Sequence, residues 1–391
     1  MGHGEKKGVI NLLQEFSLPL IAGVILALLW ANLNHHSFHT FLHYHIANIE
    51  GLNFHFLVND IFMVFFFGIA AVEITQSVLP GGDLNPISKA VNPLMATVGG
   101  VLGPIAVFFI LNSIMGKSAW SNGWGIPTAT DIALAWLAAR MVFGAKHPAV
   151  SFLLLLAIAD DAIGLVIIAV FYPNPAKPVQ PIFLLITVLA MLISLGLRKK
   201  KVQNHLFYLI FGGIVSWFGL FKAGVHPALA LVFIVPFMPS APLDKKATHL
   251  MEEADDEKST IAHFEHTWKL FVDIGLLAFG LANAGVVVEG VNNLTWIILF
   301  ALVVGKVSGV FIFSNIAILF KAPLPDGMNR KTLFVAGFVA ALGLTVALFV
   351  SGQAFSTAPE QGAAKMGALL SAGVGFLAII LGKVLKIEKK N

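Results

Sequence analysis

The sequence predicts an all-α polytopic membrane protein, and three observations support this fold class. Of the 391 residues, 57% are hydrophobic and only 12% are charged, whereas soluble domains are about half apolar and about one quarter charged. The apolar residues form runs of about 20, which is the length of a membrane-spanning helix. Lys and Arg are concentrated between alternate runs. The low fraction of charged residues places the chain in the class of membrane proteins.

About 12 apolar segments are predicted to cross the bilayer as helices, because lipid cannot satisfy the backbone polar groups of an open strand. In chain order the predicted spans are 15–33, 54–80, 91–113, 124–143, 148–172, 180–197, 205–221, 223–239, 264–288, 294–320, 332–355 and 364–386. Span 223–239 contains three prolines and follows the preceding span almost directly.

The polar segments predict one integral membrane domain over residues 1–391. Residues 1–14 are expected to form a retained cytoplasmic tail, since no small-residue cleavage site follows a short apolar core. Residues 240–263 are expected to form a cytoplasmic loop that is too short for a core of its own. Residues 387–391 are expected to form a cytoplasmic C-terminal tail.

The distribution of Lys and Arg predicts that both termini are cytoplasmic. Most of the 25 Lys and Arg residues fall on the side of the termini, while the opposite side has only Lys117, Lys177, Lys222 and Lys365. Cytoplasmic connections carry such an excess of positive charge. Topology therefore explains the net charge of +4 without a nucleic-acid partner. The chain has no cysteine, which excludes disulfides and thiolate metal sites.

Asp160 and Asp161 are adjacent carboxylates in the middle of the predicted span 148–172. Ionisable groups at this depth cost several kcal/mol each and are functional candidates by default. Neighbouring helical positions differ by about 100°, so one carboxylate can face a cavity while the other faces a neighbouring helix. The alternative is that both are structural and are satisfied by hydrogen bonds.

Thr130 and Asp131 follow Pro127 in the segment IPTATD of span 124–143. A helix break there would free backbone carbonyls and expose a helix N-terminus at membrane depth, as in the ion sites of transporters. A proline kink with Asp131 as an ordinary helix cap is the alternative.

Lys306 lies in the middle of span 294–320. A lone buried ammonium must lose its proton or find a partner, and the carboxylates at that depth are Asp131, Asp160 and Asp161. A purely structural Lys–Asp pair is the alternative.

Span 332–355 has three glycines and Thr345 but no charge. These residues permit either unwinding or close helix packing.

Four further residues are candidates for pH sensing. Glu73 lies near a span end, where an interfacial or capping role is the alternative. His226, His263 and His266 titrate near neutral pH if unperturbed, although exposed histidines often have no role. The His-rich segment 35–45 is expected to be a solvated loop, with metal binding or a dimer contact as alternatives.

The intramembrane residues favour ion exchange over enzymatic chemistry. Carboxylates and hydroxyls are hard oxygen ligands that suit Na⁺, Li⁺ or protons. A desolvated carboxylate can hold a proton or a cation near neutral pH, but not comfortably both. The sequence contains no P-loop, no HExxH motif and no GxGxxG after a strand. We therefore expect no enzyme and no cofactor, only transported Na⁺ or Li⁺ and H⁺.

At these residues the chain resembles the bacterial NhaA family of Na⁺/H⁺ antiporters. The matching segments are VNDIFMVFFFGIAAVEI, GIPTATDIALA, LAIADDAIGLVIIAVFY, KAGVHPALA, FGLANAGV, VVGKVSGV and LGLTVALF, in family order. The resemblance covers nearly the whole chain. It implies an inverted-repeat transporter of the bacterial inner membrane, with two discontinuous helices (spans 4 and 11) that cross near the midplane.

The resemblance also implies a role for each site residue. Asp161 would be the main cation ligand, and Asp160 would pair with Lys306 and exchange that partner during transport. Thr130 and Asp131 would lie where the broken fourth helix meets the eleventh. The double Asp is what electrogenic members show, so more protons than sodium ions would move per cycle. The expected partners are Na⁺, Li⁺, H⁺ and membrane lipid, with a homodimer as a further candidate.

The sequence departs from the family in the segment associated with pH sensing. The family usually has a basic and an acidic residue just after the glutamate that matches Glu73, whereas this chain has Gln76 and Ser77. Ala262 stands where the family has an acidic residue beside the histidine pair. We therefore expect antiport with an altered pH response.

Two other functions compete with antiport. A sodium-coupled solute symporter would need a polar pocket beyond the carboxylates, and the spans have few Asn, Gln or Ser clusters. An intramembrane aspartyl protease would need two facing carboxylates from separate segments. Asp160 and Asp161 are neighbours on one helix, which leaves only Asp131 with Asp161 for that role.

Overall fold

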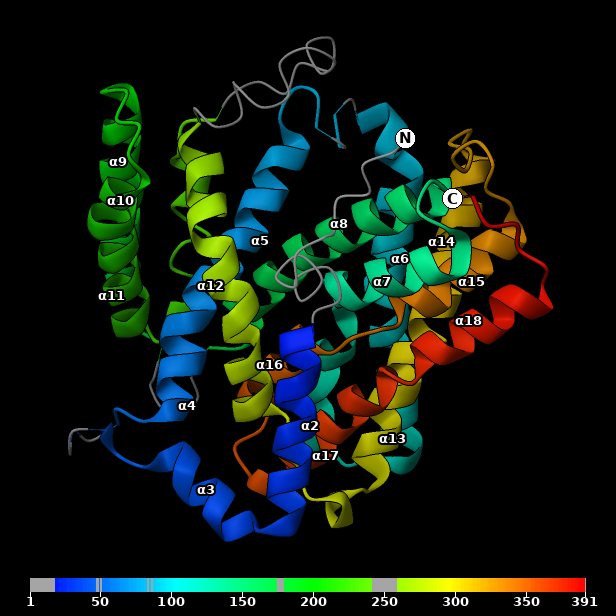
Figure 1. Ribbon diagram of the computed structural model, residues 1–391, viewed down its shortest axis with the longest axis horizontal. Coiled ribbons are helices and arrows are strands. Elements are labelled where there is room, and N and C mark those ends of the chain that lie inside the picture. Colours follow the sequence, from blue (N-terminus) through cyan, green and yellow to red (C-terminus); the bar gives the residue numbers. More distant parts are fainter. Residues whose placement is uncertain are drawn as a thin grey trace, which may run out of the picture.

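The computed structural model describes residues 18–46, 49, 51–82, 84–85, 87–173, 179–240 and 259–390. Within these residues all regular secondary structure is helical. The helices form a bundle with α9–α11 at one edge and α15 and α18 at the other (Figure 1). The predicted tail 1–14 and residues 241–258 of the predicted loop lie outside the described part of the chain.

The helices of the described chain have the following bounds: α2 (Leu18–Leu33), α3 (His35–His43), α4 (Phe54–Phe56), α5 (Met63–Val78), α6 (Ile87–Met115), α7 (Ile132–Phe143), α8 (Pro148–Phe171), α9 (Leu184–Lys199), α10 (His205–Phe207), α11 (Ile214–Ala223), α12 (Thr260–Asn283), α13 (Asn293–Phe300), α14 (Lys306–Leu319), α15 (Arg330–Ala340), α16 (Thr345–Ala354), α17 (Ala358–Ser371) and α18 (Val374–Val384). Short π-helical segments join α4 to α5, α10 to α11 and α13 to α14.

Seven helices of the described residues are long and apolar enough to cross a membrane, and two bent pairs bring this number to nine. The seven are Phe54–Val78, Ala90–Met115, Pro148–Phe171, Pro181–Lys199, His205–Ala223, Asn293–Leu319 and Ala358–Val384. Six of them match a predicted span to within two residues at each end, whereas Ala358–Val384 begins six residues before the predicted span 364–386. α2 is a shorter apolar helix. The protein is therefore an all-helical, multi-pass membrane protein, and the predicted count of 12 spans is not confirmed.

The prediction of a helix over 223–239 is wrong. α11 ends at Ala223, and Gly224 adopts a left-handed conformation with φ 78°, which glycine allows without a steric penalty. Turns follow, with short 3₁₀ helices at Pro227–Leu229 and Val235–Phe237. Proline lacks the N–H that a continuing helix needs and clashes with the preceding turn. Most apolar side chains of this segment are nevertheless buried.

Close packing of α6 against α14 positions Lys306, the first residue of α14. These two helices make the most extensive contact among the described elements. Gly99 lies against the backbone of Gly309, and Gly103 lies against the backbone of Gly305. Small residues let helix backbones approach in this way. Lys306 directly follows Gly305, whose backbone contacts the backbone of α6.

Candidate functional site

Two helix breaks meet each other at the centre of the site. The 3₁₀ helix Ser118–Thr128 and α7 are bent by 56°, and α15 and α16 are bent by 50°. Across the breaks, the Asp131 N–H donates to the Leu342 carbonyl at 2.6 Å, and the Thr345 N–H donates to Asp131 Oδ2 at 3.2 Å. Each break therefore satisfies backbone groups that the ends of the other helix leave unpaired.

Asp131 is both the residue at the break and the cap of α7. Its φ and ψ of −82° and 105° are extended, and Oδ1 accepts a hydrogen bond from the Leu134 N–H at 3.0 Å. The side chain is buried, and its oxygens face the positive ends of two helices. Asp131 thus caps α7 and lies in the bend between the 3₁₀ helix Ser118–Thr128 and α7.

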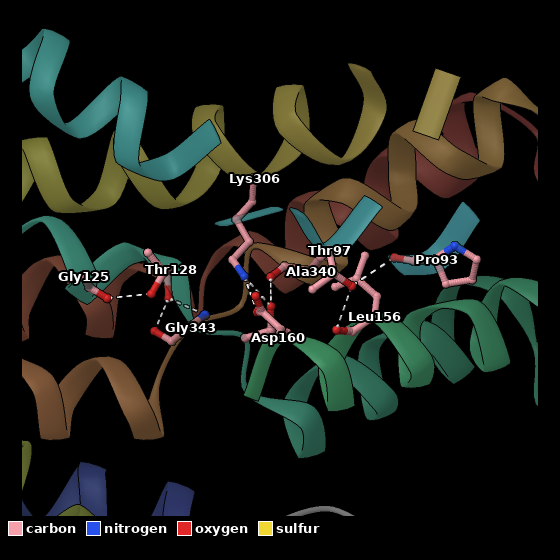
Figure 2. A network of polar contacts seen from close by, with 11 residues as sticks. Pro93, Thr97, Gly125, Thr128, Leu156, Asp160, Lys306, Ala340 and Gly343 are labelled. Carbon is pink, nitrogen blue, oxygen red and sulfur yellow. Dashed lines mark hydrogen bonds and ion pairs between the residues drawn. The ribbon is translucent and has the colours of Figure 1, made fainter. Parts of the chain in front are cut away.

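Lys306 pairs with Asp160, one of the three carboxylates considered for it. Lys306 Nζ forms an ion pair with Asp160 Oδ2, and both side chains are fully enclosed. Figure 2 shows Lys306 pointing toward Asp160, with Ala340 beside the pair. Lys306 Nζ also donates to Thr130 Oγ1 at 2.8 Å, and Thr130 Oγ1 donates to the Ala340 carbonyl at 2.8 Å. The pair therefore links α8 and α14 to both breaks.

Asp161 lies beside this pair without a hydrogen bond for one of its oxygens. Asp161 is partly exposed, and it lies within electrostatic range of Asp160, Glu73 and Asp131. In the described structure Oδ1 of Asp161 and Oδ1 of Asp160 are both buried and accept no hydrogen bond. An unsatisfied buried oxygen carries a desolvation cost. These two oxygens can therefore accept a proton or a small cation.

Neighbouring polar contacts hold the site elements in place. Thr97 Oγ1 of α6 donates to the Pro93 carbonyl at 2.9 Å and to the Leu156 carbonyl of α8 at 3.3 Å (Figure 2). Ser371 Oγ of α17 donates to the Gly343 carbonyl at 2.9 Å, within the second break. Sequence reasoning missed Thr97 and Ser371, because a hydroxyl in an apolar helix gives no signal of which carbonyl it contacts.

The four pH-sensing candidates are not joined by hydrogen bonds in the described structure. His226 is buried, its ring lies 4.8 Å from that of Phe349, and its Nδ1 accepts from the Ala228 N–H at 3.3 Å. His263 and His266 are exposed on α12. Glu73 lies on α5, within electrostatic range of Lys269 and Glu265 on α12.

Glu265 connects α12 to the altered segment of α5. Gln76 Nε2 donates to Glu265 Oε2 at 3.3 Å, and Glu265 Oε1 lies 3.6 Å from Lys269 Nζ. Glu265 was missed in the sequence, although its position between His263 and His266 was a signal. Ala262 has no carboxylate, but Glu265 provides one about one helical turn later on α12.

The described residues contain no group of three or more His, Cys, Asp or Glu side chains that could hold a metal ion. The site offers two carboxylates, the Thr130 hydroxyl and backbone carbonyls. Such oxygens suit a singly charged hard cation, which here would be a substrate and not a resident cofactor.

Comparisons with known proteins show which family and which fold the chain resembles. The family described as Na⁺/H⁺ antiporter 1 matches residues 9–385. The chain is 58% identical to the Na(+)/H(+) antiporter NhaA of Geotalea uraniireducens (strain Rf4) over 382 residues, and the match covers 98% of each chain. It is 59% identical to the Na(+)/H(+) antiporter NhaA of Desulfitobacterium hafniense (strain DSM 10664 / DCB-2) over 384 residues, again with 98% of each chain covered. The structure of the sodium proton antiporter MjNhaP1 from Methanocaldococcus jannaschii has a similar fold, with a TM-score of 0.51 and 14% identity, covering 97% of this chain and 99% of that chain.

Proposed function

The chain belongs to the Na⁺/H⁺ antiporter 1 family and is a Na⁺/H⁺ antiporter, and from this premise we propose that Asp160 and Asp161 bind the exchanged ions. The family consists of transporters and not enzymes. The observation that carries the proposal is the pair of buried, unsatisfied oxygens on Asp160 and Asp161. They lie beside a buried ammonium and beside two helix breaks.

Asp161 is the main ligand of Na⁺ or Li⁺ in this proposal. Its carboxylate has no ammonium bonded to it in the described structure, whereas Asp160 is engaged by Lys306. Asp161 and Asp160 interact electrostatically, so a cation at Asp161 Oδ1 is also attracted by the charge of Asp160. Protonation removes the negative charge that attracts the cation, so Na⁺ and H⁺ compete for the site.

Lys306 supplies the second proton of the cycle. When Na⁺ approaches Asp160 and Asp161, its charge repels the Lys306 ammonium and favours the neutral amine. One Na⁺ then displaces one proton from Asp161 and one from the Lys306–Asp160 pair. The two carboxylates and the lysine titrate as a coupled unit. Exchange of one sodium ion for two protons moves net charge, so we propose that transport is electrogenic.

Alternating access follows from movement of the broken helices. We propose that each bent pair is one discontinuous span, the fourth and the eleventh, and that the two cross near the membrane midplane within an inverted-repeat fold. Discontinuous helices at a central site are a recurring architecture of secondary transporters. The hydrogen bond that the Asp131 N–H donates to Leu342 and the one that Asp131 accepts from the Thr345 N–H support a coupled movement of both breaks.

The remaining expectations belong to the same proposal. The protein forms one domain in the bacterial inner membrane, and both termini are cytoplasmic. It is in contact with membrane lipid and exports sodium. A homodimer is its candidate assembly. Glu73, His226, His263 and His266 contribute to regulation by pH. The contact of Gln76 with Glu265 supports an altered pH response.

Transport in everted membrane vesicles tests the proposal. Addition of Na⁺ or Li⁺ should dissipate a preformed proton gradient, and it should also reduce the membrane potential because exchange is electrogenic. Asp161→Asn should abolish the response while the protein still inserts. Asp326→Asn, at an exposed carboxylate, is the matched control and should respond as the wild type does. Full exchange by Asp161→Asn would move the ion site elsewhere.

A further inference from the structure

A polar cavity of about 450 Å³ lies where the C-terminal chain meets the first residues of α8 and α15. Its charged and polar lining includes His147, Asn329, Lys331, Lys386, Glu388 and Lys390. The ion site uses none of these residues. The cavity nevertheless touches the beginning of the helix that carries Asp160 and of the helix that ends in a break.

The C-terminal chain is fixed in place at this cavity by its backbone. The Lys390 N–H donates to the Phe143 carbonyl at 2.9 Å, and the Lys146 N–H donates to the Lys390 carbonyl at 2.9 Å. Lys386 has a φ of 53°, a left-handed conformation that is uncommon outside glycine. The predicted tail 387–391 is thus packed on the end of α7 as far as Lys390.

The lysines around the cavity form no ion pair with a described residue. In the part of the chain that the structure describes, no carboxylate lies within ion-pair distance of Lys331, Lys386 or Lys390. Glu388 also lines the cavity, but it forms no ion pair with these lysines. Like charges that converge on one cavity repel each other, and an anion between them would relieve that repulsion.

His147 adds a buried donor to the same cavity. It is only 4% exposed, and its Nδ1 accepts a hydrogen bond from the Ala149 N–H at 3.0 Å. The ring proton is therefore on Nε2, for which the described structure provides no acceptor. Burial and the nearby Lys390 lower the pKa of His147. The ring is then a neutral N–H donor on the cavity wall.

The first backbone N–H groups of α15 are already satisfied by a side-chain cap, so they are not the groups that would bind an anion. Asn329 Oδ1 accepts from the Lys331 N–H at 2.9 Å and from the Thr332 N–H at 3.0 Å. Recognition of an anion would therefore come from the lysine side chains and His147, not from free backbone groups of the helix.

We propose that this cavity binds a phosphate-bearing anion, either the headgroup of an anionic phospholipid or free phosphate. A phosphate group presents several strong acceptor oxygens, which match three ammonium groups and one imidazole N–H. Basic pockets at the ends of membrane helices bind lipid headgroups in this way. The bound anion joins the beginnings of α8 and α15 to the C-terminal chain and stabilises their arrangement. This proposal does not depend on the assignment of the ion site.

Binding is measured first with inorganic phosphate on the purified full-length protein in a nonionic detergent. Potassium phosphate should raise the Tm more than potassium chloride of equal ionic strength, because a ligand of the folded state stabilises it. Lys386→Gln/Lys390→Gln should weaken the apparent affinity by about tenfold or more, since two charge-assisted hydrogen bonds are lost. Lys199→Gln/Lys200→Gln removes the same charge at the end of α9 and should leave the affinity unchanged.

A second measurement identifies the source of the phosphate. Native mass spectrometry after reconstitution with phosphatidylglycerol or phosphatidylcholine should detect retained phosphatidylglycerol, lost in Lys386→Gln/Lys390→Gln, if the ligand is a headgroup. Phosphate stabilisation without retained lipid would identify the free anion.

His147→Asn provides an independent variant, because Asn keeps an acceptor for the Ala149 N–H and removes the Nε2 donor. It should weaken binding even if the lysine variant does not fold. The proposal is overturned if neither phosphate nor phosphatidylglycerol distinguishes the wild type and the α9 variant from the cavity variants.

Discussion

Lys306 and Asp160 form an ion pair in which neither side chain has any solvent exposure. A buried pair of this kind adds little net stability over an apolar pair of the same shape, whereas loss of one partner leaves an uncompensated charge. The pair is therefore poorly explained by stability alone. It is well suited to a site that must gain and lose positive charge.

The first prediction concerns this pair. Lys306→Met should lower the free energy of unfolding by about 3–5 kcal/mol, because Asp160 is left charged and buried. Lys306→Gln/Asp160→Asn should recover most of that loss, since a neutral hydrogen-bonded pair replaces the ionic one. Thermal unfolding in detergent measures both variants. Equal stability of wild type and Lys306→Met would contradict the enclosed geometry.

The second prediction concerns the junction of the two breaks. Asp131→Ala should destabilise the protein by about 1–3 kcal/mol, because the Leu134 and Thr345 N–H groups lose their acceptor. Asp131→Asn keeps an acceptor oxygen for α7 and should cost less. Thermal unfolding ranks the two variants. The hydrogen bonds at Asp131 would be unimportant if Ala and Asn had the same effect.

The third prediction concerns the packing of α6 on α14. A Cβ added at Gly309 would overlap the backbone of Gly99, so Gly309→Ala should cost about 1–3 kcal/mol and displace Lys306. Gly196 on α9 has no atom within 4 Å of an added Cβ, and Gly196→Ala should be neutral or slightly stabilising. Expression, Tm and Na⁺ response compare the two substitutions. A normal Na⁺ response and Tm in Gly309→Ala would show that close approach is not required.

The fourth prediction concerns the pH response. Gln76 contacts Glu265, and Gln76→Arg would place a positive charge between Glu265 and the nearby Glu73. The charge favours ionised carboxylates, so the pH profile of exchange should move toward lower pH. Gln76→Glu should move it the opposite way. Proton-gradient dissipation measured at a series of pH values tests the pair, and an unchanged profile in both variants would remove this contact from the regulation.

The fifth prediction concerns the stability of the C-terminal contact. Burial and Lys390 lower the pKa of His147 from 6.5 in the folded state, so the unfolded chain binds more protons as the pH falls through 6.5. Stability is then complete above pH 6.5 and declines below it, toward the lower folded pKa. His147→Asn should show a smaller decline over that window. Tm measured from pH 8 to pH 5 in phosphate-free buffer is the check, and identical pH profiles would contradict it.

The sequence predicted the long apolar helices, because apolar runs are visible in it, and it located Asp131, Asp160 and Lys306, which are buried in the structure. The residue pattern alone left three carboxylates open as the partner of Lys306, since the choice depends on how α8 and α14 are rotated about their axes; only the family resemblance implied Asp160, the partner that the structure shows. The carbonyls of Ala340 and Leu342 could not be predicted, because every residue carries a carbonyl. The prediction of a helix over 223–239 was wrong because it gave more weight to the apolar character of the segment than to its three prolines.

The glycine contacts between α6 and α14 have a mechanical consequence. Because Gly99 and Gly103 touch the backbone of the opposite helix at Gly309 and Gly305, the two helices cannot slide past each other without separating. We therefore expect α6 and α14 to move as one unit that carries Lys306. In the proposed mechanism, a movement that parts Lys306 from Asp160 would come from α8 and the two breaks.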